Sequence, residues 1–297
     1  MSNSQLDLFS NQYKELIEDQ FQKSINGLEA PNILKESMLY SLEAGGKRIR
    51  PLLLFATIDA FQKDPKIGLQ AACAIEMIHT YSLIHDDLPS MDDDDLRRGK
   101  PTNHIVFGEA NAILAGDALL TYSFQLVAET PEETVSLKNK LDLIKLLSHS
   151  AGAEGMVGGQ VADMIGEEKT LNLEELQYIH LHKTGKLLSC SILSGAILAE
   201  ATQEQKSNLE KFAYHLGLAF QIRDDLLDIS GDASIIGKPV GSDSENHKST
   251  YPSLLGVNGA EEALNEHYQL AMDALYKVGG NTGLLEALTE MIVKRNH

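Results

Sequence analysis

Helical patterning covers most of the 297 residues, and it limits the folds open to this chain more than any other feature. Apolar residues recur at helical spacing over long segments, such as 173–200 and 203–230. Short alternating segments between turn dipeptides, which would predict strands, are almost absent. Helices with so many apolar residues have to pack against one another. The sequence therefore predicts an all-α, single-domain multi-helix bundle over residues 1–297, with its site in a central cavity between facing helices.

Glycines and prolines predict where several of these helices end. A helix from about residue 67 leads into an acidic cluster containing Pro89, which should end or kink it. We expect one continuous helix over about 104–129, with Pro131 at the cap of the next. The glycines of segment 155–159 should loosen the chain after that helix.

The charge and the cysteines limit the partners and the compartment. The net charge is −18 and the pI is about 4.9, which argues against nucleic acid and anionic membranes as partners and suits multivalent cations. Cys73 and Cys190 lie in apolar segments and are expected to be buried packing residues. Residues 1–16 lack a secretory signal pattern, and the longest near-apolar run, 187–199, is too short to span a bilayer. We expect a soluble protein of a reducing cytoplasm, without an integral membrane segment.

An acidic cluster occupies the centre of the first half of the chain. Asp86, Asp87 and the run Asp92–Asp95 fall within ten residues. Carboxylates this close repel one another unless a cation lies among them, and Mg²⁺ takes oxygen ligands from carboxylates and substrate phosphates. Because Pro89 interrupts the helix, Asp92 can return towards Asp86 from a loop. The alternative is a solvated acidic loop.

A second acidic cluster lies far along the chain, inside a segment predicted to be helical. Asp224 and Asp228 are four residues apart and share a helix face with Gln221, between apolar flanks. Ionised groups are costly to bury unless they are paired, so this stripe indicates bound cations. Two such clusters facing each other across a pocket would hold two or three Mg²⁺ ions and a diphosphate.

Each of several basic residues can either bind an anionic ligand or have a purely structural role. Lys47, Arg48 and Arg50 stand at the start of a predicted helix, where an anion is favoured; the alternative is a basic cap that pairs with surface carboxylates. His79 lies seven residues before the first acidic cluster and can donate to a phosphate, or it can be a core histidine bonded to a carbonyl. Arg97 and Arg98 can bind a diphosphate or pair with Asp92–Asp95.

Two further segments can contribute to a diphosphate site. His182–Lys186 interrupts an apolar helix, where Gly185 is unfavourable and Thr184 can bond back to a carbonyl and bend the helix. A kink there would turn carbonyl groups towards a pocket. Lys238 follows the second acidic cluster in a predicted loop and can fold over a bound diphosphate.

Six motifs in this order resemble those of the trans-prenyltransferase (polyprenyl synthase) family, and the match covers nearly the whole chain. They are GGKRIRP at 45–51, DDLPSMD at 86–92, RRGKPT at 97–102, KTG at 183–185, FQIRDD at 220–225 and DDLLD at 224–228. The resemblance implies the all-α isoprenoid-synthase fold and a homodimer. It also implies Mg²⁺-dependent head-to-tail condensation of isopentenyl diphosphate with dimethylallyl and then geranyl diphosphate, as in the members that form farnesyl diphosphate.

The resemblance also implies roles for individual residues. The metal ligands would be Asp86, Asp92, Asp224 and Asp228; the isopentenyl diphosphate would contact Gly46, Lys47, Arg50, His79 and Arg98; and the allylic substrate would contact Arg97, Lys183, Thr184, Gln221 and Lys238. Tyr81 and Ser82, just before the first motif, would form the floor that stops chain growth at farnesyl diphosphate. The alternative for Tyr81 is simple packing between helices.

Four other functions are alternatives to this one. A geranylgeranyl or longer-chain synthase would keep the mechanism but need a different floor. A terpene cyclase needs no second diphosphate site, so GGKRIRP and Arg98 argue against it. A non-catalytic partner subunit should have lost aspartates, and both clusters are intact. A ferritin-like di-metal bundle needs two Glu-x-x-His motifs, and only Glu76–His79 is present.

Overall fold

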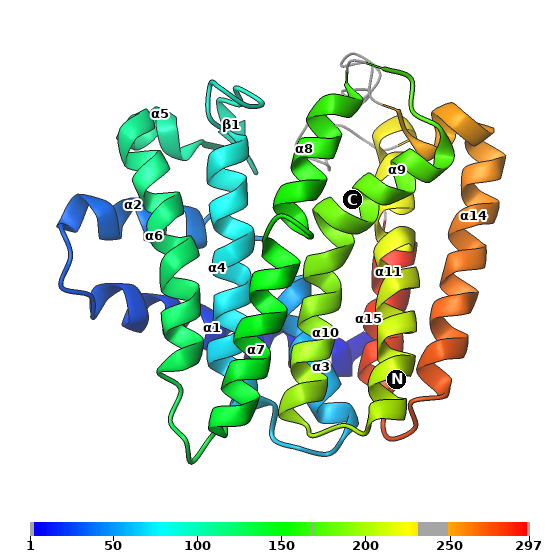
Figure 1. The fold of residues 1–297 in the computed structure, drawn as a ribbon, viewed down its shortest axis with the longest axis horizontal. Helices are drawn as coiled ribbons and strands as arrows, with labels where there is room; N and C mark the ends of the chain where they lie inside the picture. Colours follow the sequence, from blue (N-terminus) through cyan, green and yellow to red (C-terminus); the bar gives the residue numbers. More distant parts are fainter. Residues whose placement is uncertain (1–2, 168, 231–248, 296–297) are drawn as a thin grey trace. The chain divides into compact units, whose positions relative to one another are not determined.

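The computed structural model describes residues 3–167, 169–230 and 249–295, and its regular structure is almost entirely helical (Figure 1). The all-α prediction is confirmed. A small antiparallel hairpin joins β1 (Leu96–Arg97) to β2 (Lys100–Pro101). The chain divides into two compact units, an amino-terminal unit (Ser2–Leu52 and Pro65–Ile144) and a carboxy-terminal unit (Leu53–Asp64 and Lys145–His297). The single domain stays a prediction.

The amino-terminal unit is built around a buried helix that leads to the first acidic cluster. Its helices are α1 (Asn3–Asn26), α2 (Asn32–Leu42), η1 (Pro65–Gly68), α4 (Leu69–Asp86), α5 (Asn103–Phe107) and α6 (Glu109–Ala128). Two more, α3 (Ile49–Ala60) and α7 (Leu137–Ala151), belong partly to each unit. The central helix α4 packs along α6, as Figure 1 shows, and eleven of its residues are buried. It is apolar all round because it is covered on several sides.

Two predicted helix boundaries in this unit are wrong. The helix expected over 104–129 is broken at Gly108, whose φ of 82° lies in the left-handed region that glycine adopts without strain. Pro131 does not cap α7, because it begins a turn in which the Val135 amide donates to the Pro131 carbonyl at 3.0 Å. The helix starts only at Leu137.

The carboxy-terminal unit packs long helices around a second core. Its remaining elements are α8 (Met156–Gly166), α9 (Leu173–Ile179), η2 (His180–Gly185), α10 (Lys186–Leu198), α11 (Gln203–Ser230), α14 (Tyr251–Tyr276) and α15 (Gly283–Lys294). Helix α11 runs beside α14 (Figure 1), and Leu218, Ile222 and Leu226 are buried in the core between them.

The interruption predicted at 182–186 is confirmed as a π-helical segment, η2, between α9 and α10. Such segments widen the helix by one residue per turn and occur often at functional sites. A Cβ atom on Gly217 of α11 would lie 3.0 Å from the Cα atom of Gly185, so the two glycines let α11 approach the widened turn closely.

One helical segment, Pro65–Asp86, is long and apolar enough to cross a membrane by composition alone. Its mean hydropathy is 1.2, but 67% of the window is buried inside the protein. Burial of that extent is typical of a core helix, because a lipid-facing helix has no protein side chains covering it.

Candidate active site

The first acidic motif forms a loop that folds back on the end of α4. Helix α4 ends at Asp86, and Pro89 follows in the turn. The Asp92 amide then donates to the Asp86 carbonyl at 2.9 Å. The predicted return of Asp92 towards Asp86 is therefore confirmed at the level of the backbone. Asp86 is half-buried and Asp92 is exposed, so both carboxylates are accessible to a ligand.

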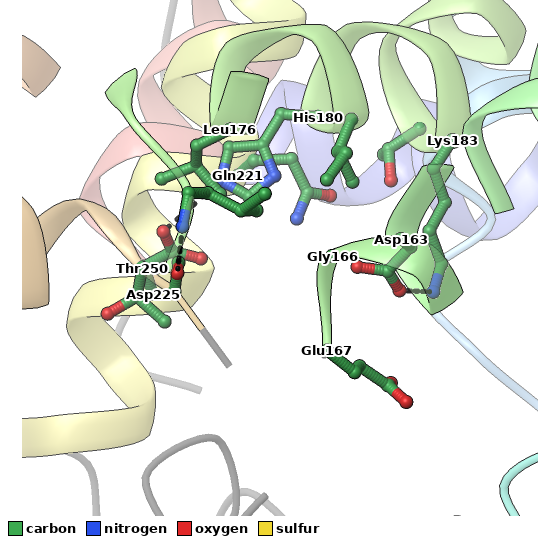
Figure 2. Close-up of a pocket in the computed structure, with 13 residues that line it drawn as sticks. Asp163, Gly166, Glu167, Leu176, His180, Lys183, Gln221, Asp225 and Thr250 are labelled. Carbon is green, nitrogen blue, oxygen red and sulfur yellow. Dashed lines mark hydrogen bonds and ion pairs between the residues drawn. The ribbon is translucent and has the colours of Figure 1, made fainter. Parts of the chain in front are cut away.

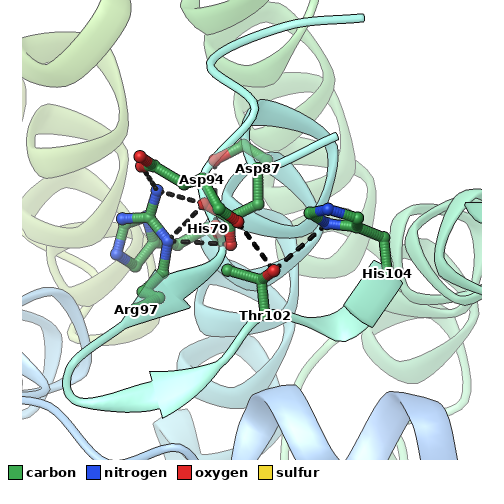
Figure 3. Close-up of polar contacts among 7 residues, drawn as sticks. His79, Asp87, Asp94, Arg97, Thr102 and His104 are labelled. Atoms are coloured by element: carbon green, nitrogen blue, oxygen red, sulfur yellow. Dashed lines mark hydrogen bonds and ion pairs between the residues drawn. The ribbon is translucent and has the colours of Figure 1, made fainter. Parts of the chain in front are cut away.

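A buried ion pair anchors this loop. The Arg97 Nε atom donates to both carboxylate oxygens of Asp87, at 2.7 and 2.9 Å, and the same guanidinium lies 3.6 Å from Asp94 (Figure 3). Asp87 is only 3% exposed, and Nη2 of Arg97 also donates to its Oδ1 atom, so two guanidinium nitrogens bond one carboxylate, an arrangement that is strong and directional. The alternative prediction, that Arg97 pairs with the acidic run Asp92–Asp95, is confirmed for Asp94. Sequence reasoning missed Asp87 as the main partner, because its spacing from Arg97 corresponds to no helical or strand period.

Thr102 at the end of the RRGKPT motif supports the acidic loop from its other side. Its hydroxyl donates to the Asp94 carbonyl at 2.7 Å, and its amide donates to the Asp95 carbonyl at 2.9 Å (Figure 3). The same hydroxyl lies 3.1 Å from Nδ1 of His104. Backbone groups of the loop are thus bonded to protein, while the side chain of Asp92 stays exposed.

Cationic side chains of two motifs gather near His79 on α4. Burial lowers the pKa of His79 well below 6.5, and the positive charges of Arg50, Arg98 and Arg97 lower it further. A histidine is kept neutral when cations already occupy its surroundings, and a neutral ring can still donate one N–H to a phosphate oxygen. The electrostatics therefore favour an anion beside His79.

Arg48 has a structural role that the sequence did not indicate. Its guanidinium donates to Glu76 at 2.9 Å, and both side chains are buried. It is therefore engaged within the unit, whereas Lys47 is exposed and Arg50 is half-buried. The same ion pair occupies the carboxylate that a ferritin-like di-metal site would require.

The GGKRIRP and RRGKPT motifs meet at Gly46. The Arg98 guanidinium donates to the Gly45 carbonyl, and a Cβ atom on Gly46 would lie only 2.6 Å from Nη1 of Arg98. The φ angle of Gly46 is 128°, which side chains rarely adopt. Gly46 is needed because Arg98 crosses over it, and the contact brings two of the predicted isopentenyl diphosphate residues together.

The two residues predicted to limit product length lie one turn before Asp86. Tyr81 is buried, and burial together with the negative charge of Asp86 raises the pKa of its phenol to about 12. Its hydroxyl therefore stays protonated at neutral pH. The Ser82 hydroxyl donates to the His79 carbonyl at 2.9 Å. Their role as a floor stays a prediction.

In the carboxy-terminal unit, one pocket brings together three residues predicted to contact the allylic substrate. Lys183 and Thr184 of η2 line it with Gln221 of α11 (Figure 2). Lys183 donates to Asp163 of α8 at 2.6 Å, a partner that sequence reasoning missed. The predicted loosening of segment 155–159 is wrong from Met156 on: α8 is helical, and Gly159 lies so close to η2 that a Cβ atom would be 2.1 Å from the backbone nitrogen of Lys183.

Asp225 is a buried anchor in this pocket. Its Oδ2 atom lies 3.2 Å from Nε2 of His180 on η2 and accepts the Tyr251 amide at 2.9 Å, where α14 begins. The His180 and Tyr251 rings stack with centroids 5.8 Å apart, and Gln177 donates to the Tyr251 hydroxyl at 3.0 Å. One carboxylate therefore holds η2 and α14 against α11.

The first aspartate of the second motif is bound by the last described residue. Arg295 donates to Oδ1 of Asp224 at 2.6 Å and lies 4.1 Å from the centroid of the Phe220 ring. The Arg295 carbonyl accepts from Nε of Arg223 at 2.8 Å. Asp224 and Asp228 are both half-buried on α11, and Lys238 lies outside the described residues.

The carboxylates of both motifs fit Mg²⁺ better than a metal that needs a complete set of protein ligands. Among the described residues, no three His, Cys, Asp or Glu side chains converge into a ready-made metal site. Mg²⁺ is usually held by one or two carboxylates together with substrate phosphates and waters, so it needs no such cage. Asp86 and Asp92, joined through their backbones, offer oxygen ligands of this kind.

Comparison with known proteins identifies the family. Residues 31–278 match the family model described as polyprenyl synthetase. A farnesyl diphosphate synthase from Geobacillus stearothermophilus is 56% identical over all of both chains, and one from Bacillus subtilis (strain 168) is 53% identical over 96% of each. The crystal structure of a FPP/GFPP synthase from Zymomonas mobilis has a TM-score of 0.87 at 36% identity, covering 98% of this chain and 99% of that one. The chain therefore belongs to the polyprenyl synthetase family.

Proposed function

We propose that this protein makes farnesyl diphosphate by Mg²⁺-dependent condensation of isopentenyl diphosphate with dimethylallyl diphosphate and then with geranyl diphosphate. The observation that carries the proposal is the full-length similarity to a farnesyl diphosphate synthase, together with both acidic motifs intact. An alternative is a geranylgeranyl or longer product; the similar protein from Zymomonas mobilis is an FPP/GFPP synthase.

Isopentenyl diphosphate would bind in the amino-terminal unit. Lys47, Arg50 and Arg98 would neutralise its diphosphate, with Gly46 leaving room for the Arg98 side chain. The neutral ring of His79 would donate one hydrogen bond without adding charge. The positive charges of the arginines around His79, which add to burial in lowering its pKa, support an anion at this place.

The allylic diphosphate would have Arg97, Lys183 and Lys238 as its cationic partners. Asp86, Asp92, Asp224 and Asp228 would hold Mg²⁺, which when bound neutralises the leaving diphosphate as a Lewis acid. Lys183 would exchange its bond to Asp163 for one to the substrate. The fixed positions of these cations would lower the cost of separating charge in the transition state.

The reaction would then proceed through an allylic cation. The allylic C–O bond breaks, and its electron pair leaves with the diphosphate. Oxygen dipoles of Thr184 and Gln221 would face the cation, because both residues line the same pocket. The isopentenyl double bond attacks the allylic carbon to form a C–C bond, and the released diphosphate takes the proton that is lost. Water has to be kept away from the cation, which it would otherwise quench.

The protein would work as a cytoplasmic homodimer. Ile105 and Val106 on α5 and Ile113 and Leu114 on α6 are large apolar residues with 42–56% of their surface exposed. Exposed apolar groups of this kind often mark a contact surface, and a second copy can cover them. Sedimentation of the purified protein would measure the molecular mass in solution.

Product analysis would test the proposal. The purified protein is incubated with Mg²⁺, dimethylallyl diphosphate and labelled isopentenyl diphosphate, beside the Tyr81→Ala variant. We expect farnesyl diphosphate from the parent and longer products from the variant. A longer product from the parent would keep the mechanism and remove the role of Tyr81, whereas no incorporation at saturating Mg²⁺ would overturn the proposed function.

A further inference from the structure

A glycine on α6 provides a recess for a histidine on α4. A Cβ atom on Gly116 would lie 2.1 Å from Nε2 of His85 and 2.5 Å from its Cδ2 atom, so no other residue fits there while His85 keeps its place. Gly116 is buried inside α6, where glycine is a poor helix former. Its φ angle is not in the left-handed region, so the backbone itself does not require glycine. The close approach of His85 is the feature that does.

His85 is bonded in the recess and touches the residue proposed as the floor. Its Nε2 atom lies 3.1 Å from the Ile113 carbonyl of α6. Its ring meets the ring of Tyr81 edge to face, with centroids 5.7 Å apart and planes at 77°. The two residues are four apart on α4, so they share one face of that helix. A rigid contact therefore runs from α6 through His85 to Tyr81.

We infer that His85, seated against Gly116, is a positioning residue that sets product length by holding the Tyr81 ring in place. The inference rests on the proposed floor role of Tyr81. A floor stops chain growth only if its ring does not yield to the growing hydrocarbon. The Tyr81 ring packs against the His85 ring, and His85 is held by α6. The Tyr81 ring therefore has a fixed neighbour on that side.

Three variants separate this role from general packing. His85→Ala removes the ring contact, Gly116→Ala displaces His85 while favouring the helix, and the double variant removes both the ring and the clash. We expect the ratio of geranylgeranyl to farnesyl diphosphate to rise about fivefold in each, since an edge-to-face aromatic contact shifts equilibria by about that factor. The double variant should match His85→Ala, because the three atoms nearest to the added methyl group all belong to the His85 ring.

Gly283→Ala is the matched control, because the nearest atom to its added Cβ would be 3.7 Å away, an ordinary contact. Its product ratio should equal that of the parent. Circular dichroism and thermal unfolding show that each variant is folded before products are compared. If Tyr81→Ala lengthens the product while the His85 and Gly116 variants do not, His85 has no positioning role and the inference is overturned. If Tyr81→Ala also leaves the product unchanged, the floor itself is wrong.

Discussion

Each acidic motif begins with two adjacent aspartates, and the two pairs divide their work in the same way. The second aspartate is buried in both, with Asp87 3% and Asp225 5% exposed. The first, Asp86 or Asp224, is half-buried. Buried carboxylates have to be bonded to protein, and both of these are. The comparison indicates that one aspartate of each pair anchors the motif by bonding to protein from a buried position, whereas the other keeps more contact with solvent.

The two anchors differ in what they hold. Asp87 binds Arg97 from the same loop, so the first motif is tied to itself. Asp225 binds His180 and the Tyr251 amide, which come from segments far apart in the sequence. The first anchor is a charged pair, whereas the second is a junction of three helical segments. Substitutions should therefore affect the first mainly through charge and the second mainly through lost hydrogen bonds.

The largest expected effect is on folding stability, and it should be larger for the Asp87 anchor than for the Asp225 anchor. Asp87→Ala leaves a largely buried guanidinium without its main partner and should lower the free energy of unfolding by about 3 kcal/mol. Asp225→Ala leaves the Tyr251 amide and the His180 ring without their shared partner and should lower it by about 2 kcal/mol. Denaturant unfolding measures both, with Asp95→Ala, an exposed side chain in the first motif, as the control at about 0.5 kcal/mol or less. The reverse order would contradict the comparison.

An intermediate effect concerns Asp224, the half-buried first aspartate of the second motif. Arg295 pairs with Asp224, whose side chain is 43% exposed, so Arg295→Gln should lower stability by only about 1 kcal/mol. If Asp224 binds Mg²⁺, the freed carboxylate should bind it about threefold more tightly, as measured by calorimetric titration in the presence of diphosphate. Lys294→Gln, which removes an exposed pair with Glu290, is the control. Equal Mg²⁺ affinity in all three proteins would show that Arg295 does not compete with the ion.

The smallest expected effect is a pH dependence centred on the first motif. The pKa of His79 is lowered well below 6.5 by burial and by nearby arginines. The unfolded chain therefore binds a proton that the folded chain does not, so this contribution is complete above pH 6.5 and is lost as the pH falls below it. His79→Gln should flatten the rise in unfolding midpoint between about pH 5 and 7. Burial also lowers the pKa values of His215 and His267, so some slope should remain. Parallel curves for parent and variant would exclude His79 as a source.

Some local features follow from neighbours in the chain and could be predicted from the sequence. Pro89 explains why Asp92 returns to Asp86, and the residues around Gly185 explain why the long helix is interrupted. The break at Gly108 was missed, because the surrounding apolar pattern continues across it and only the left-handed φ of the glycine interrupts the helix. Periodicity reports which face is apolar, but it does not report a single residue that leaves the helical conformation.

The all-helical class, the order of the motifs and the family follow from the amino-acid sequence, because these depend on periodicity and on residues at fixed spacing. The packing of the helices sets which aspartate of each pair is buried. It also decided that Lys183 pairs with Asp163 and that His85 fits against Gly116. These partners are 20 and 31 residues apart, on different helical segments. No local rule relates such positions, because the contact exists only once the helices have packed.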